Sequence, residues 1–189
     1  MRKTIVLIGA AVVLSGCGML PGGQPQTAAK EAGTTAPAPP QSAPQQTAPP
    51  QADVVIATRA AKVGSGGQYG EARVDITALK RQGRTVTLNW TITAVDGKVN
   101  VHNGLGGGVL DYTVSNVSLI DPVNAKRYRV ARNGTGADAT CVCSGTQGQF
   151  LEAGKSSTLY AVFAAPPPEV TKVNVEMPML GVLTDVPLS

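Results

Sequence analysis

Residues 85–95 alternate strictly between apolar and polar side chains. The apolar positions are Val86, Leu88, Trp90, Ile92 and Ala94, and mainly threonine and asparagine fill the positions between them. Successive side chains of a strand point to opposite faces, so a period of two over ten residues indicates a half-buried antiparallel strand. We expect Trp90, the single tryptophan, at the centre of a core.

Shorter apolar runs separated by turn residues follow the same pattern. Strands are predicted at 73–80, 112–120, 127–130, 156–164, 170–177 and 182–186, with a further start at 54–56 and a turn at Asp96-Gly97 that ends the longest strand. With 15% charged residues, 22 Gly and 14 Pro, the chain is unlike a helical bundle. About seven short strands predict an all-β fold for residues 53–189, an immunoglobulin-like sandwich of two antiparallel sheets.

The N-terminus has the pattern of an export signal. Arg2 and Lys3 precede an uncharged, mostly apolar run at 4–14. As a helix this run would rise about 16 Å, half of the ~30 Å hydrocarbon layer, which is typical of a signal sequence and too short for a membrane span. Removal of residues 1–16 lowers the net charge from +4 to +2, which disfavours nucleic acid as a partner.

Residues 14–17, Leu-Ser-Gly-Cys, resemble the bacterial lipobox. The resemblance implies cleavage between Gly16 and Cys17 and a diacylglyceryl group on the Cys17 thiol, which would hold the protein on the extracytoplasmic face of the cell membrane. The alternative is an ordinary secretory signal that happens to contain a cysteine. From Cys17 to residue 52 the chain is rich in Pro, Gln and Ala, with eight of its fourteen prolines, and we expect a disordered tether.

Cys141 and Cys143 remain once Cys17 is assigned to lipidation. In an extended segment their Cα atoms would lie about 6.6 Å apart, so a slight kink would allow the disulfide expected outside the cytoplasm. The alternative hypothesis is a thiol-redox or Cu(I) site that adds His102, Met177 or Met179 as further ligands.

Residues 126–132 form the most basic run of the chain. Its cations are Lys126, Arg127, Arg129 and Arg132, which are candidates for contact with an anionic wall polymer or lipid headgroups. On a strand, Arg127 and Arg129 would share one face and Tyr128 and Val130 the other. The alternative is a solvated sheet face that the arginine stems cover.

The sequence contains no complete motif of a nucleotide-binding protein or a hydrolase. Gly154-Lys155-Ser156 lacks the upstream glycine of a P-loop and leads into a strand. His102 is the single histidine, and no G-x-S-x-G elbow accompanies it. We therefore predict no catalytic residues, no metal and no enzymatic activity.

The second half of the globular region resembles a known family. Residues 117–189 contain VSLIDPVNAKRYRV, CVCS, FLEAGKSSTLYAVFAAPP and GVLTDVPLS. These motifs are similar to an immunoglobulin-like segment of exported actinobacterial proteins, which in some of them precedes an OmpA-like domain, and to bacterial telokin-like lipoprotein domains. This resemblance implies no enzymatic activity. We further expect no cofactor beyond covalent lipid, and an envelope protein or a wall polymer as the partner, contacted through loops and sheet edges.

Overall fold

The computed structural model describes residues 54–65 and 67–189. The predicted signal peptide at 1–16, the lipidation site Cys17 and the tether to residue 52 lie outside the described residues. No α-helix occurs in the described part, and no helix there is long and apolar enough to cross a bilayer. The all-β prediction is therefore confirmed.

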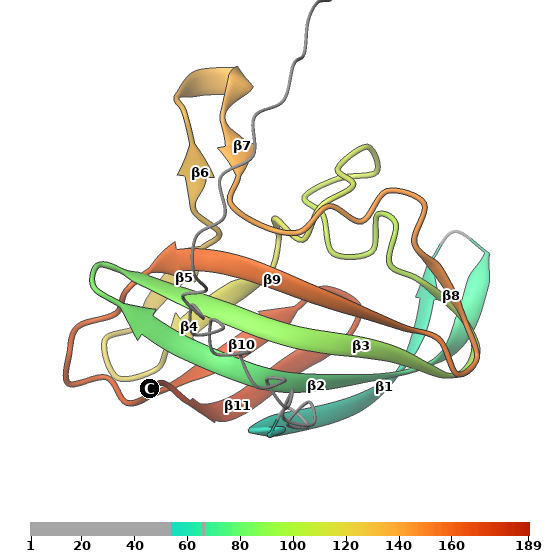
Figure 1. The fold of residues 1–189 in the computed structure, drawn as a ribbon, viewed down its shortest axis with the longest axis horizontal. Coiled ribbons are helices and arrows are strands. Elements are labelled where there is room, and N and C mark those ends of the chain that lie inside the picture. The colour runs from blue at the N-terminus through green and yellow to red at the C-terminus, as the bar shows by residue number, and fades with distance from the viewer. Residues whose placement is uncertain (1–53, 66) are drawn as a thin grey trace, which may run out of the picture. The chain divides into compact units, whose positions relative to one another are not determined.

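One sheet is built around the longest strand, β3, and every strand pair in it is antiparallel. β1 and β2 lie in order on one side of β3, while β8 and β9 both pair with its other side (Figure 1). The strands of this first sheet are β1 (Ala57–Ser65), β2 (Gln68–Gln82), β3 (Thr85–Asn100), β8 (Phe150–Glu152) and β9 (Ser156–Ala164).

A second antiparallel sheet has the order β11-β10-β4-β5. Its strands are β4 (Ser118–Asp121), β5 (Lys126–Arg129), β10 (Lys172–Met177) and β11 (Gly181–Pro187). A small hairpin of β6 (Arg132–Asn133) and β7 (Thr140–Cys141), with a 3-10 turn at Gly136–Asp138, projects away from both sheets (Figure 1).

The alternation of β3 is the pattern predicted from the sequence. Its five apolar side chains between Val86 and Ala94 are fully buried, and the side chains between them are partly exposed. On the partly exposed face, Thr91 Oγ1 lies 3.2 Å from Thr158 Oγ1 of β9, and Thr93 Oγ1 lies 2.9 Å from Ser156 Oγ. The strand thus divides its side chains between core and solvent.

Both sheets contribute to a single core. Trp90 and Phe163 from the first sheet are fully buried in the same hydrophobic cluster as Leu119, Val175 and Met177 from the second. Burial of each such side chain contributes about 1.5–3 kcal/mol, so this shared core is what holds the two sheets together.

The predicted turn at Asp96-Gly97 is wrong, because β3 continues through it to Asn100. The register shifts at this point: Ala94 pairs with Ala72, Asp96 pairs with Glu71, and Val95 is the extra residue of a bulge. Gly97 lies opposite Gly70 with φ +64°, and a Cβ at Gly97 would overlap the carbonyl oxygen of Tyr69. Glycine here permits a close backbone approach and a bulge, where the sequence pattern suggested a strand end.

The predicted strand at 112–120 is also wrong over most of its length. The structure has strand only at β4, while residues 112–117 form a loop with one isolated bridge, Thr113 to Gly145. This loop turns toward the segment that precedes β8, so its backbone bonds are made outside the sheets. Val114 and Val117 are still buried, which explains the apolar spacing that looked like a strand.

A side chain from the first sheet contacts the N-terminal end of β11. Arg59 of β1 donates from Nε to the Leu180 carbonyl at 2.7 Å and from Nη1 to the Val182 carbonyl at 3.2 Å. Two backbone acceptors beside this edge strand are thereby satisfied.

Candidate functional site

A hollow lies between the loop at 107–116 and the segment 129–132, which leads from β5 into the β6–β7 hairpin. It has a volume of about 750 Å³ and adjoins a second hollow of about 510 Å³; Leu110, Asp111, Ser115 and Arg132 line both. Arg129 and Val130 line the first hollow only, and Cys141 and Cys143 the second. We call this pair of hollows the arginine groove.

Asp111 holds the loop wall of the arginine groove in shape. Its Oδ2 accepts hydrogen bonds from Gly107 N at 2.9 Å and from Ser115 Oγ, and its Oδ1 accepts one from Thr113 Oγ1 at 2.5 Å. Burial raises the pKa of Asp111, but the bonds from Ser115, Thr113 and Gly107 outweigh burial and lower the pKa below its ordinary value. The ionised carboxylate is therefore a structural anchor whose lone pairs are already engaged.

The opposite wall is fixed to the edge of β9. Val130 bridges to Phe163, and Ala131 N donates to Val162 O at 2.7 Å. Further along, Val142 N donates to Ala131 O at 2.8 Å, and Cys143 bridges to Ala161. The chain is therefore bonded to β9 both before and after the hairpin, which fixes the hairpin beside the loop.

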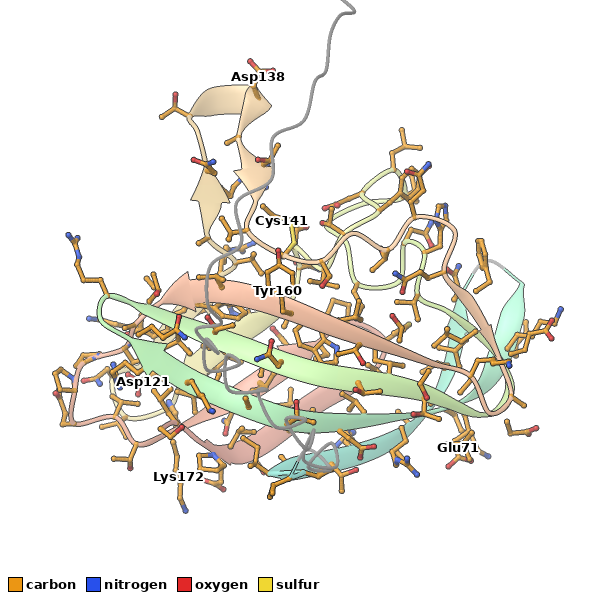
Figure 2. The ribbon with its side chains drawn as sticks, in the orientation of Figure 1. Glu71, Asp121, Asp138, Cys141, Tyr160 and Lys172 are labelled. Atoms are coloured by element: carbon orange, nitrogen blue, oxygen red, sulfur yellow. A yellow bond between two sulfur atoms is a disulfide. The ribbon has the colours of Figure 1, made fainter. Side chains whose placement is uncertain are left out.

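Cys141 and Cys143 are joined by a disulfide, as predicted. Their sulfur atoms are 2.05 Å apart and their Cα atoms 5.4 Å apart, closer than in a straight strand. Cys141 belongs to the hairpin strand β7, whereas Cys143 pairs with β9, so the bond spans the kink between hairpin and sheet. Figure 2 shows Cys141 at the base of the hairpin.

The four predicted cations lie in three different environments. Arg129 and Arg132 line the arginine groove. Arg127 pairs with Glu176, and Lys126 lines a different hollow beside Tyr128. The predicted split of faces is present, since Val130 is buried and Tyr128 packs on the core while Arg127 and Arg129 are exposed.

Arg127 is engaged within the second sheet. Its Nη1 donates to Ser118 Oγ at 2.9 Å and to Glu176 Oε2, so the guanidinium spans from β5 across β4 to β10. The hydrogen bonds from Arg127 and then Ser118 lower the pKa of Glu176. Of the four cations, Arg127 is the one in an ion pair within the described residues.

Most residues of the alternative metal site have other contacts. His102 stacks on Tyr112 with ring centroids 4.1 Å apart, and its Nδ1 accepts from Gly148 N at 2.8 Å. Met177 is buried in the core, and no group of three His, Cys, Asp or Glu with metal-ligand geometry occurs in residues 54–65 and 67–189. A thiol or copper chemistry at Cys141 and Cys143 would first require reduction of their disulfide.

Sequence reasoning missed the loop side of the groove. Val109 and Leu110 are 78% and 79% exposed, although they are apolar and adjacent. The signal was present in the pattern Gly-Gly-Gly-Val-Leu-Asp-x-Thr-x-Ser, where a carboxylate is followed by hydroxyls that can bond it.

No protein-family model, curated protein or solved structure matches this chain.

Proposed function

We propose that this chain is a lipid-anchored protein of the bacterial cell envelope that binds an acidic segment of a partner protein in the arginine groove and catalyses no reaction. The lipobox-like residues ending at Cys17 and the Pro-rich tether support anchoring at the extracytoplasmic face of the membrane. Two antiparallel sheets around one core support the immunoglobulin-like sandwich.

The observation that carries the proposal is the composition of the groove walls. Arg129 and Arg132 form no ion pair with any described carboxylate, and Asp111 beside them is saturated by its own loop. Val109 and Leu110 present apolar surface on the loop side. Arginine is enriched at protein-binding surfaces, and a bound protein would remove the neighbouring apolar side chains from water.

A partner protein and an anionic wall polymer would contact different side chains of the groove walls. Both would use the arginine charges, because guanidinium groups bind carboxylate and phosphate in the same way. A protein segment would also cover Val109 and Leu110, whereas a polar polymer gains nothing from them. The apolar pair therefore favours a protein, and it provides the means to tell the two apart.

The test is photo-crosslinking in intact cells with the full chain. A photo-reactive amino acid replaces Leu110 at the groove, and Tyr69, which is 75% exposed and belongs to β2, serves as the matched control position. We expect a discrete crosslinked protein from position 110 and none of that size from position 69. Equal products from both positions would overturn the proposal.

Charge dependence is tested in the same cells. Arg129→Glu should lower the yield at position 110 by tenfold or more, because a charge-assisted hydrogen bond contributes about 1.5–3 kcal/mol. Lys62→Glu, an equal charge change on exposed β1, should leave the yield unchanged. If Arg129→Glu abolishes retention on isolated wall polymer and Val109→Ser has no effect on either readout, the ligand is a polymer and the protein partner is ruled out.

A further inference from the structure

Three turns meet at the end of the domain marked by Asp121 in Figure 2, away from Glu71. They are the β2–β3 turn at Gly83 and Arg84, the β4–β5 turn at 122–125, and the proline run at 166–168. The β2–β3 turn, the segment 164–168, Lys126 and Tyr128 line an open hollow of about 550 Å³, and the turn at 122–125 directly precedes Lys126. We call this end the basic pole.

Three cations line the hollow at the basic pole. Arg84 and Lys126 are exposed, and Arg81 is held by the carbonyls of Pro166, Pro167 at 3.3 Å and Val170 at 3.1 Å. None of the three takes part in an ion pair within the described residues. Carbonyl groups hold the Arg81 guanidinium in place but leave its charge uncancelled, so the positive charges add.

The acidic neighbours, Asp121 and Glu169, offset this charge only in part. Asp121 is fully buried, its Oδ1 accepting from Val123 N at 3.0 Å and Asn124 N at 3.1 Å, and its Oδ2 accepting from Asn124 Nδ2 at 2.8 Å. The Asp121 carboxylate is hydrogen-bonded within its own turn, and its charge acts on Lys126. Glu169, exposed in the loop after the prolines, contributes one opposing charge and does not line the hollow.

An apolar side chain lies at the tip of the β4–β5 turn. Val123 is 80% exposed, the highest value among the large hydrophobic residues described. Its backbone is fixed by the bond to Asp121, and Ala125 with φ 50° closes the turn before Lys126. An exposed apolar side chain held in a hydrogen-bonded turn just before Lys126 needs little ordering to insert into an interface.

We infer that the basic pole docks onto the surface of an anionic phospholipid bilayer. Arg84, Lys126 and Arg81 bind lipid phosphates, and Val123 enters the boundary between headgroups and acyl chains. Anionic headgroups attract surface cations with about 1 kcal/mol per Lys or Arg, and apolar burial adds to that attraction. The inference goes beyond the proposed function, uses none of the groove residues, and shares with it only the location at a membrane.

The experiment uses the full chain reconstituted through its own N-terminus on lipid vesicles. Val123→Trp reports contact at the pole, while Tyr69→Trp reports at a matched exposed position elsewhere. The native Trp90 is fully buried and gives a constant background. On phosphatidylglycerol vesicles we expect a blue-shifted emission for the Val123→Trp protein that brominated lipids quench; on phosphatidylcholine vesicles and for Tyr69→Trp we expect neither.

Charge variants complete the test. Arg84→Gln with Lys126→Gln should shift the docking equilibrium by about 30-fold toward the undocked state, since two cations are lost. Lys62→Gln with Lys155→Gln removes the same charge from exposed positions outside the pole and should change nothing. An equal signal on both lipids, or no response to the pole variants, would overturn the inference. A third outcome would also overturn it: free glycerol phosphate shifts NMR signals at the pole, while vesicles leave the emission of the Val123→Trp protein unchanged. The hollow would then bind a soluble phosphate and not a bilayer.

Discussion

Val130, the residue after β5 of the second sheet, bridges to Phe163 of β9 in the first sheet. The chain therefore passes directly from one sheet to the edge of the other, and both residues belong to the shared core. Because the hairpin starts two residues later, its place beside the loop at 107–116 is set by the core. The arginine groove is in this way a consequence of how the two sheets are joined.

Acid should weaken the loop that Asp111 organises. The folded-state pKa of Asp111 lies below its ordinary value, so its stabilising contribution is complete above the ordinary pKa and is lost as the pH falls through the folded value. Asp111→Asn should cost about 1–2 kcal/mol at pH 7, where charged hydrogen bonds are lost. Thermal unfolding of both proteins from pH 7 to pH 2 should show the difference shrinking toward the acid end. A difference that stays constant with pH would contradict this account.

The pair Arg127 and Glu176 should couple weakly and only while Glu176 is ionised. Both side chains are partly exposed, so a double-mutant cycle with Arg127→Gln and Glu176→Gln should give about 0.5 kcal/mol at pH 7. Because the pKa of Glu176 is lowered, the coupling should persist below the ordinary glutamate pKa and vanish as the pH falls through the folded value. Urea unfolding at several pH values measures the coupling, and coupling that survives full protonation would contradict its ionic origin.

The disulfide should matter more for the hairpin than for the fold. Cys141→Ser with Cys143→Ser opens a very short loop, for which chain entropy accounts for about 1.5 kcal/mol. Hydrogen exchange should accelerate in residues 132–141, whereas protection of β3 should fall only in step with the global stability. Faster exchange in β3 beyond that change would show that the disulfide supports the core instead.

Two glycines with similar backbone angles should differ sharply when replaced by alanine. Gly83 has φ +61° with open space around it, so Gly83→Ala should cost about 1–2 kcal/mol from the left-handed conformation alone. Gly97 has φ +64°, and an added Cβ also meets the Tyr69 backbone, so Gly97→Ala should cost roughly 1–3 kcal/mol more. Urea denaturation compares the two proteins, and equal losses would exclude a role for close packing at the bulge.

Periodicity predicted the strands in which one face is buried. The strands β3 and β9 alternate clearly because each lies in the first sheet with its inner face on the core. The short strands β6 and β7 carry no such pattern, since they pair outside both main sheets. Local alternation thus identifies the strands that bury one face in the core.

The candidate site depends on distances that the sequence does not contain. Lys126 and Arg129 are three residues apart, yet they line different hollows. Arg84 and Lys126 are far apart in the chain and line the same one. Pairing across the sheets decides these neighbours, so a run of cations predicted a binding surface but not its shape.

The contact of Arg59 with the carbonyls of Leu180 and Val182 has a consequence for self-association. An open strand edge can pair with a second copy of the same chain. Because the Arg59 guanidinium already binds these two acceptors, an incoming strand finds fewer hydrogen-bond partners at this end of β11.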